Sequence, residues 1–158
     1  MARAYLPAMD IGSLAYRTFA HATEDEAKVE QALKFASGAE EIKKSSTVGY
    51  HGNPIIVLEA RVTDAKGIKA FFSGLPKEDV KDLLDSLEKR VDEESFFFLR
   101  LDKQEAYQGR LKLADHEDVI AVRGKVKSYP QNRDNAVAAM SKFLQSVLDR
   151  ADRMDKKD

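Results

Sequence analysis

Basic side chains alternate with apolar ones between Ser95 and Pro130, a spacing that suits the binding of phosphate groups. Residues two positions apart in a β-strand point to the same face of a sheet, so the alternation predicts three consecutive strands with one apolar and one cationic face. Cations on neighbouring strands, roughly 4.8 Å apart, can meet successive phosphates of an RNA strand. The basic residues with the parity of the outer face are Arg100, Arg110, Lys112, Arg123, Lys125 and Lys127.

Aromatic residues near these cations could stack on RNA bases. Phe96 and Phe98 share the parity of Arg100, and Tyr129 ends the third predicted strand. Stacking of unpaired bases on aromatic rings is a common mode of RNA recognition. A simpler interpretation stays open, in which the charges only solvate the outer sheet face and Phe96 and Phe98 are buried under a loop or a subunit contact.

Further candidate RNA contacts lie around this predicted face. Asp102 is expected to accept N–H bonds in a turn, while Lys103 points to solvent or RNA. Arg133, near the start of the last predicted helix, could bind a phosphate at that helix N-terminus or be an ordinary surface cation. The other candidates are His51, Arg61, Tyr107 and Tyr129.

Residues with catalytic or metal-binding potential form no recognisable motif. The three histidines lack metal-ligand spacing, and there is no glycine-rich phosphate loop, serine nucleophile motif or dinucleotide-binding fingerprint. We therefore expect no enzyme activity, no cofactor and no metal. A metal-dependent RNA hydrolase is the least favoured alternative, because it would require the fold to gather the carboxylates of Glu24, Glu59, Asp102 and Glu105.

Composition limits the class of protein. The chain has 158 residues, 43% of them hydrophobic, and a formal net charge of −1. These values suit one globular domain with a core, in which a nucleic-acid site must come from local clustering of charge. The chain has no cysteine. With no export motif at the N-terminus and no stretch of roughly 20 apolar residues, this predicts a soluble, cytoplasmic protein without a membrane partner.

Periodicity predicts the elements that would position these residues. The expected order is strand, helix, two strands, two helices, three strands and a final helix. Because the strands come as hairpins and each helix has one apolar stripe, we predict the α+β class, as a single domain with a largely antiparallel sheet and helices packed on one face. The predicted organisation is an N-terminal extension over residues 1–12, one domain over 13–150 and a charged flexible tail over 151–158.

Several boundaries follow from local motifs. Thr23 and Glu26 have the spacing of a capping box for the first helix, which Gly38 would end. Asp64 is expected to cap the next helix, and Pro76 to start a continuous helix beyond it. Strands are predicted over 13–22, 45–51, 55–63 and 107–113, and the last helix over 132–150.

Longer phrases of the sequence resemble a known family. The clearest is Leu-Asp-Lys-Gln-Glu-Ala-Tyr at 101–107, and others are His-Ala-Thr-Glu-Asp at 21–25, His-Gly-Asn-Pro-Ile at 51–55, Leu-Glu-Ala-Arg at 58–61, Arg-Val-Asp at 90–92 and the segments 122–123 and 126–130. Together they resemble the archaeal family of predicted RNA-binding proteins, also described as predicted exosome subunits. The resemblance implies an archaeal cytoplasmic protein with a fold similar to ribosomal protein L-five, and it supplies no catalytic residues.

The leading prediction is thus an RNA-binding accessory protein, linked to RNA processing or degradation, that holds RNA on a basic sheet face. Its expected partners are RNA and RNA-processing or exosome proteins, and a homodimer is left open. The alternative is a protein-interaction module that docks on an RNA-processing complex without touching RNA. An exposed apolar patch, with Phe96, Phe97 and Phe98 as the first candidates, would mark that alternative.

Overall fold

The computed structural model of the protein describes residues 10–49, 51–114 and 116–156. Strands and helices alternate irregularly along the chain. The elements are β1 (Ile11–Ala20), α1 (Glu26–Ser37), β2 (Lys43–Val48), β3 (Pro54–Val62), α2 (Ala65–Ser73), α3 (Lys77–Asp85), α4 (Leu87–Arg90), β4 (Phe96–Asp102), α5 (Lys103–Tyr107), β5 (Val119–Val126) and α6 (Arg133–Lys156). No helix within these ranges combines the length and the apolar character needed to span a membrane.

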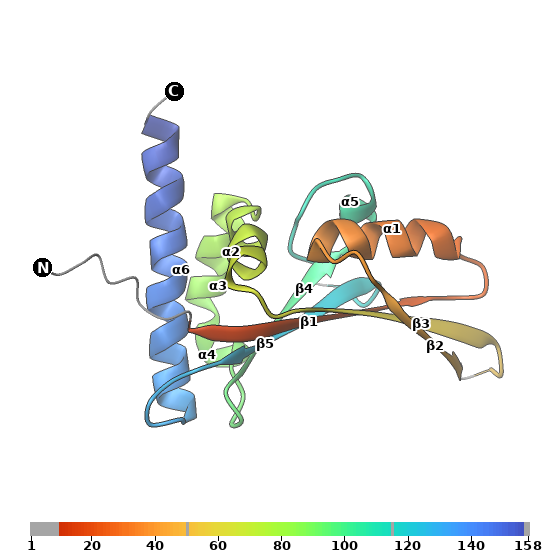
Figure 1. Cartoon of the computed structure of the whole chain (residues 1–158), viewed down its shortest axis with the longest axis horizontal. Coiled ribbons are helices and arrows are strands. Elements are labelled where there is room, and N and C mark those ends of the chain that lie inside the picture. Colours follow the sequence, from red (N-terminus) through yellow and green to blue (C-terminus); the bar gives the residue numbers. More distant parts are fainter. Residues whose placement is uncertain (1–9, 50, 115, 157–158) are drawn as a thin grey trace, which may run out of the picture.

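The strands form one five-stranded antiparallel sheet in the order β2-β3-β1-β5-β4. Helices α1, α2 and α5 lie on one side of it, and α6 stands across the end where β1 begins (Figure 1). Among the described elements, none covers the side of β1 and β3 opposite α1 (Figure 1). The prediction of an α+β fold with an antiparallel sheet is therefore confirmed.

The core fills the space between the sheet and these helices. Alternate strand residues such as Leu14, Leu58 and Ile120 are fully buried, as is Leu33 from the apolar stripe of α1. Aromatic rings join the layers: Phe72 of α2 meets Phe143 of α6 edge to face, with 5.1 Å between the ring centroids. Burial of such side chains is the main favourable contribution to folding.

Local capping explains where several helices begin and end. Asp25, and not the predicted Thr23, caps α1 by accepting a hydrogen bond from Ala27 N at 3.0 Å. Asp64 caps α2 and Gly38 ends α1 in a left-handed conformation, as predicted. The helix predicted to run on from Pro76 is instead divided into α3 and α4 at Ser86, which lies between them with non-helical φ −113° and ψ 14°.

The strand predicted over residues 107–113 does not form. Its place is taken by α5, a turn at Gly109 with φ 85°, and a single bridge between Leu101 and Leu113. The cause is local, because Asp102 Oδ1 accepts a hydrogen bond from Glu105 N at 3.0 Å and so starts a helix from good helix formers. The predicted three-strand meander is therefore the pair of β4 and β5.

Several other element ends differ from the prediction. β1 begins at Ile11, inside the range predicted as an extension, and ends at Ala20. β2 ends at Val48, before the predicted end at residue 51. Helix α6 continues past Arg150 to Lys156, into the range predicted as a tail. Such shifts of helix and strand ends leave the order of the sheet unchanged.

Tyr16 is a core residue whose hydroxyl group has no hydrogen-bond partner in the described part of the chain. The side chain is 1% exposed, and its ring packs edge-on against Phe71. Burial raises the pKa of Tyr16, so the phenol stays neutral. A buried polar group without a partner destabilises the folded state.

We therefore expect Tyr16→Phe to raise the free energy of unfolding by about 1 kcal/mol. Urea denaturation followed by circular dichroism measures the change. Tyr129→Phe, at a side chain that is 98% exposed, is the matched control and should leave stability unchanged. A clear loss of stability in Tyr16→Phe would show that the hydroxyl has a partner.

Candidate nucleic-acid interface

The sheet face away from α1, named the open face here, carries rows of basic residues because strand side chains alternate between faces. The first row runs across four strands: Arg61 of β3 faces Ala15 of β1, which faces Arg123 of β5, which faces Phe98 of β4. Arg61, Arg123 and Phe98 are exposed. Two strand spacings separate the two arginines at the backbone, about 10 Å.

A second row lies next to the first. Arg17 of β1 faces Glu59 of β3 on one side and Ala121 of β5 on the other, and Ala121 faces Arg100 of β4. Arg17 is bound to Glu59, with 3.2 Å between Nη2 and Oε2. Each row thus has one arginine on each side of an alanine. The short alanine side chain leaves space between the two longer side chains.

Aromatic rings border these rows. Phe96 lies under two cations: the Arg123 guanidinium is 4.2 Å from the ring centroid and the Lys125 ammonium 4.6 Å. Cation–π contacts of this kind hold the charged groups in place. Phe98 and Phe19, by contrast, are exposed to 39% and 40%. The open face therefore combines fixed cations with accessible aromatic rings.

Positive charge on this face is only partly neutralised. Within the described ranges, Arg61, Arg100 and Arg123 form no ion pair, while Arg17 has Glu59. The pKa of Arg90, beside β4, is lowered, mainly by burial and also by the positive charge of Arg100. The carboxylate of Asp82 offsets part of this lowering of the pKa. A surface with unpaired arginines attracts anions, and arginine forks suit phosphate oxygens.

The structure places part of the predicted RNA-contact set on this open face. Arg61, Arg100, Arg123 and Lys125 have the predicted parity there. Lys127 follows β5, is exposed, and donates a backbone hydrogen bond to the carbonyl of Asp10. Two predicted contacts lie away from the strands. They are Tyr129 beyond the end of β5 and His51 in the β2–β3 turn, both exposed.

Arg110, Lys112 and Tyr107 were predicted from a strand that does not exist, so their predicted positions beside the basic face are wrong. Arg110 lies after α5 and forks onto Glu105, with 3.1 Å between Nη2 and Oε1. Tyr107 ends α5 and packs against the core, with Lys28 of α1 over its ring. Lys112 is exposed, and its carbonyl accepts from Asp102 N at the edge of β4.

Lys103 does not point to solvent or RNA, and the prediction that it does is wrong. Its side chain is 3% exposed. Its ammonium donates to the Phe19 carbonyl at 3.0 Å and pairs with Glu24 at 2.9 Å and Asp118 at 2.6 Å. These contacts tie the end of β1 to the start of α5 and to the loop before β5. We name Lys103, Glu24 and Asp118 the lysine cluster.

The lysine cluster also explains the metal-like grouping at this place. Ligand atoms of His21, Glu24 and Asp118 lie within 4.8 Å of one another. The Lys103 ammonium already contacts both carboxylates, so it supplies the positive charge that a metal ion would bring. The four carboxylates considered for hydrolysis have separate partners: Lys103 for Glu24, Arg17 for Glu59, His116 for Asp102 and Arg110 for Glu105.

The guanidinium group of Arg133 donates hydrogen bonds to backbone carbonyls of the same chain. Its Nε donates to the Val91 carbonyl at 3.0 Å, and Nη2 donates to the carbonyl of Glu88. Backbone carbonyls at a helix C-terminus lack partners within the helix, so the guanidinium caps α4. The Arg133 side chain is thus held by backbone carbonyls and is 25% exposed, and its contact with a phosphate stays a prediction.

Sequence reasoning missed Arg17, Phe19 and Lys43, which belong to the open face. The alternation of β1 already separates Tyr16 and Thr18 from Arg17 and Phe19, and could have shown them. Lys43 faces Glu59 in the pairing of β2 with β3, which places it on the same side. Its strand was predicted to begin two residues later, so Lys43 was left in the connecting loop.

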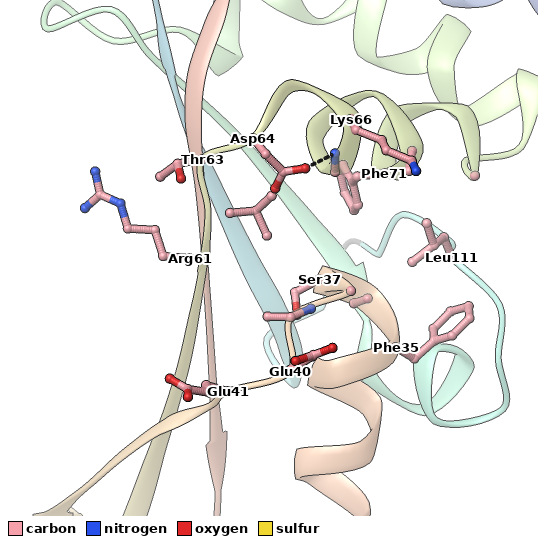
Figure 2. Close-up of a pocket in the computed structure, with 17 residues that line it drawn as sticks. Phe35, Ser37, Glu40, Glu41, Arg61, Thr63, Asp64, Lys66, Phe71 and Leu111 are labelled. Atoms are coloured by element: carbon pink, nitrogen blue, oxygen red, sulfur yellow. Dashed lines mark hydrogen bonds between the residues drawn. The ribbon is translucent and has the colours of Figure 1, made fainter.

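A hollow of about 800 Å³ lies on the other side of the sheet, between the ends of α1 and β3 and helix α2. Figure 2 shows Arg61 pointing away from this hollow. The Asp64 carboxylate accepts a hydrogen bond from Gly67 N at 2.8 Å, so it caps α2 (Figure 2). Glu40 and Glu41 add negative charge to the wall, which does not favour an RNA backbone there.

Comparison with known proteins identifies the family of this chain. A family model described as RNA binding matches residues 13–126, most of the described chain. This chain belongs to the RNA_binding family, DUF54. The match spans β1 to β5, and so contains both arginine rows of the open face. The family resemblance inferred from the sequence phrases is thereby confirmed.

Two similar proteins and a solved DUF54 structure come from archaea. RNA-binding protein PAB1135 of Pyrococcus abyssi is 41% identical over 139 residues, which cover 82% of this chain and 90% of that protein. Uncharacterized protein MJ0213 of Methanocaldococcus jannaschii is 34% identical, covering 80% of this chain and 93% of that protein. A solved DUF54 structure from Methanothermobacter thermautotrophicus superposes with a TM-score of 0.73 at 36% identity, covering 85% and 98% of the two chains.

The lysine cluster predicts a structural role for Lys103 that can be measured. Lys103→Met leaves the Phe19 carbonyl without its donor and removes the cation beside Glu24 and Asp118, which are partly exposed, so we expect the free energy of unfolding to fall by about 2 kcal/mol. Urea denaturation gives the value. Lys112→Met, at an exposed lysine nearby, is the control and should change stability little. Equal stabilities of the two variants would contradict the role assigned to Lys103.

Proposed function

We propose that this protein binds RNA on the open face of its sheet, with arginine and lysine side chains contacting phosphates. The observation that carries the proposal is the pair of arginine rows, in which Arg61 and Arg123 on one row and Arg17 and Arg100 on the next lie on either side of an alanine. Membership of the RNA_binding family and similarity to a protein named as RNA-binding support it.

The physical basis is local, because the chain as a whole has a net charge of −1. Arginines on alternate strands stand about 10 Å apart at the backbone and have long side chains, so they can follow a sugar–phosphate chain laid across the sheet. Phe96 holds the Arg123 guanidinium at 4.2 Å, which reduces the entropy lost when that group binds a phosphate.

We further propose an accessory role, in which the protein holds RNA for processing or degradation carried out by partner proteins in the archaeal cytoplasm. This part is supported by the family resemblance and by the separate structural partners of the four candidate carboxylates. The expected partners are therefore RNA and RNA-processing or exosome proteins. Catalysis by this chain is not required for such a role.

A protein-interaction module without RNA contact is the second candidate. The observation in its favour is the exposure of Phe19 and Phe98 on one face of the sheet. Phe97 does not contribute, since it is 1% exposed and belongs to the core. Arginine and aromatic residues are both common in protein interfaces, so composition does not separate the two candidates. The RNA titrations below separate them.

Paired substitutions separate a specific role of the open face from general positive charge. Arg61→Gln with Arg123→Gln removes two unpaired cations from one row, and we expect RNA affinity to fall about tenfold, because each phosphate contact contributes to binding. Fluorescence anisotropy with a labelled RNA measures it. Arg110→Gln with Lys112→Gln removes the same charge elsewhere and is the matched control. An equal loss in both pairs would contradict the assigned surface.

Salt dependence tests the phosphate contacts directly. If four to six phosphates are neutralised, the plot of log affinity against log salt should have a slope of roughly −3 to −4, from about −0.7 per contact on a single strand. The same anisotropy titrations at several salt concentrations give the slope. Affinity that does not change between about 50 and 200 mM salt would argue against phosphate contacts and for the protein-interaction module.

A further inference from the structure

Two exposed aromatic rings lie among the cations of the open face, in positions that phosphate binding alone does not require. Phe98 is next to Arg123 in the first arginine row, and Phe19 lies two residues beyond Arg17 on β1, on the same face. Their exposed fractions are 39% and 40%. No ring or cation contact occupies either of them within the described chain.

We propose that the RNA held on this face is single-stranded, and that unpaired bases stack on Phe98 and Phe19 while the arginines bind the phosphates between them. The proposal rests on the proposed function and names its ligand class. Stacking on an aromatic platform accepts any base, because every base has a π-face. The interface would therefore bind unpaired RNA with little dependence on sequence.

The chemistry of the rings favours unpaired RNA over a duplex. In an A-form duplex the bases are stacked inside, and the surface offers phosphates and 2′-hydroxyls. A phenylalanine ring placed against that surface would desolvate polar groups without giving them a hydrogen bond. Against a single strand, the same ring covers the face of a base and gains contact area. Exposed rings among cations thus match a ligand with free bases.

The positions of the rings define a path across the sheet. The row that contains Phe98 also contains Ala15, and Phe19 lies four residues further along β1. Four residues of strand and two strand spacings give a separation of about 16 Å between the two backbone positions. The row with Arg17 and Arg100 crosses between them. The order along the path is therefore aromatic, cationic, aromatic, which suits several consecutive nucleotides.

Hydrogen bonds also fix the backbone positions from which the two rings project. The Phe19 carbonyl accepts a hydrogen bond from the buried Lys103 ammonium at 3.0 Å, so the lysine cluster fixes the end of β1. The Phe98 carbonyl accepts from Arg90 at 3.3 Å, at the edge of the sheet. Phe96 differs from both, because Arg123 and Lys125 already cover its ring. Phe96 is thus a positioning residue for these cations.

The test compares a labelled RNA strand of about 12 nucleotides without self-complementarity, the duplex it forms with its complement, and the same strand with abasic residues in its centre. Fluorescence anisotropy with the full chain gives three affinities. We expect the intact strand to bind at least tenfold more tightly than the duplex. Phe98→Leu should reduce affinity for the intact strand about tenfold and leave the duplex and abasic strand unchanged.

Phe35→Leu is the matched control, because Phe35 is 45% exposed but lies on α1, on the other side of the sheet. It should bind all three RNAs like the parent protein, and circular dichroism should show both variants folded. Equal affinity for strand and duplex, or a strand preference that persists in Phe98→Leu, overturns the proposal while RNA binding stands. Absence of binding to all three RNAs at low salt overturns the proposed function and this proposal with it.

Discussion

Burial of one face of the antiparallel sheet under the helices is the interaction on which the rest of the structure depends. Side chains alternate along a strand, so packing Tyr16 and Val122 into the core forces Arg17 and Arg123 to the opposite face. A shift of one residue in register would exchange the two sets and place guanidinium groups in the core. The stability of the core therefore fixes the positions of the cations on the open face.

The connection between β4 and β5 shows how a local preference can redirect charged residues. Asp102 ends β4 and also caps α5, so the chain turns towards α1 where a third strand would have continued the sheet. Burial alone would raise the pKa of Asp102, but hydrogen bonds from Glu105 N and the His116 ring bring it below its usual value. The turn carries Lys103 inwards, where its charge serves folding and not ligand binding.

On the open face, short alanine side chains alternate with long arginine side chains across the strands. Ala15 and Ala121 each have an arginine as cross-strand neighbour on both sides, so a short side chain lies between two long cationic ones. Phe96 keeps the Arg123 guanidinium 4.2 Å from its ring centroid. In the proposed complex with RNA, Arg123 would bind a phosphate with part of its side-chain entropy already lost.

The sequence by itself determined the fold class, the caps at Asp64 and Gly38, and the outward direction of Arg100, Arg123 and Lys125, because these depend on periodicity and on contacts between near neighbours. The tertiary structure decided which strands are adjacent, and so brought Arg61 and Arg17 of distant segments into rows with them. It also decided the burial of Lys103, whose partner Glu24 is 79 positions away. Contacts over such separations depend on how the whole core packs, which no local pattern contains.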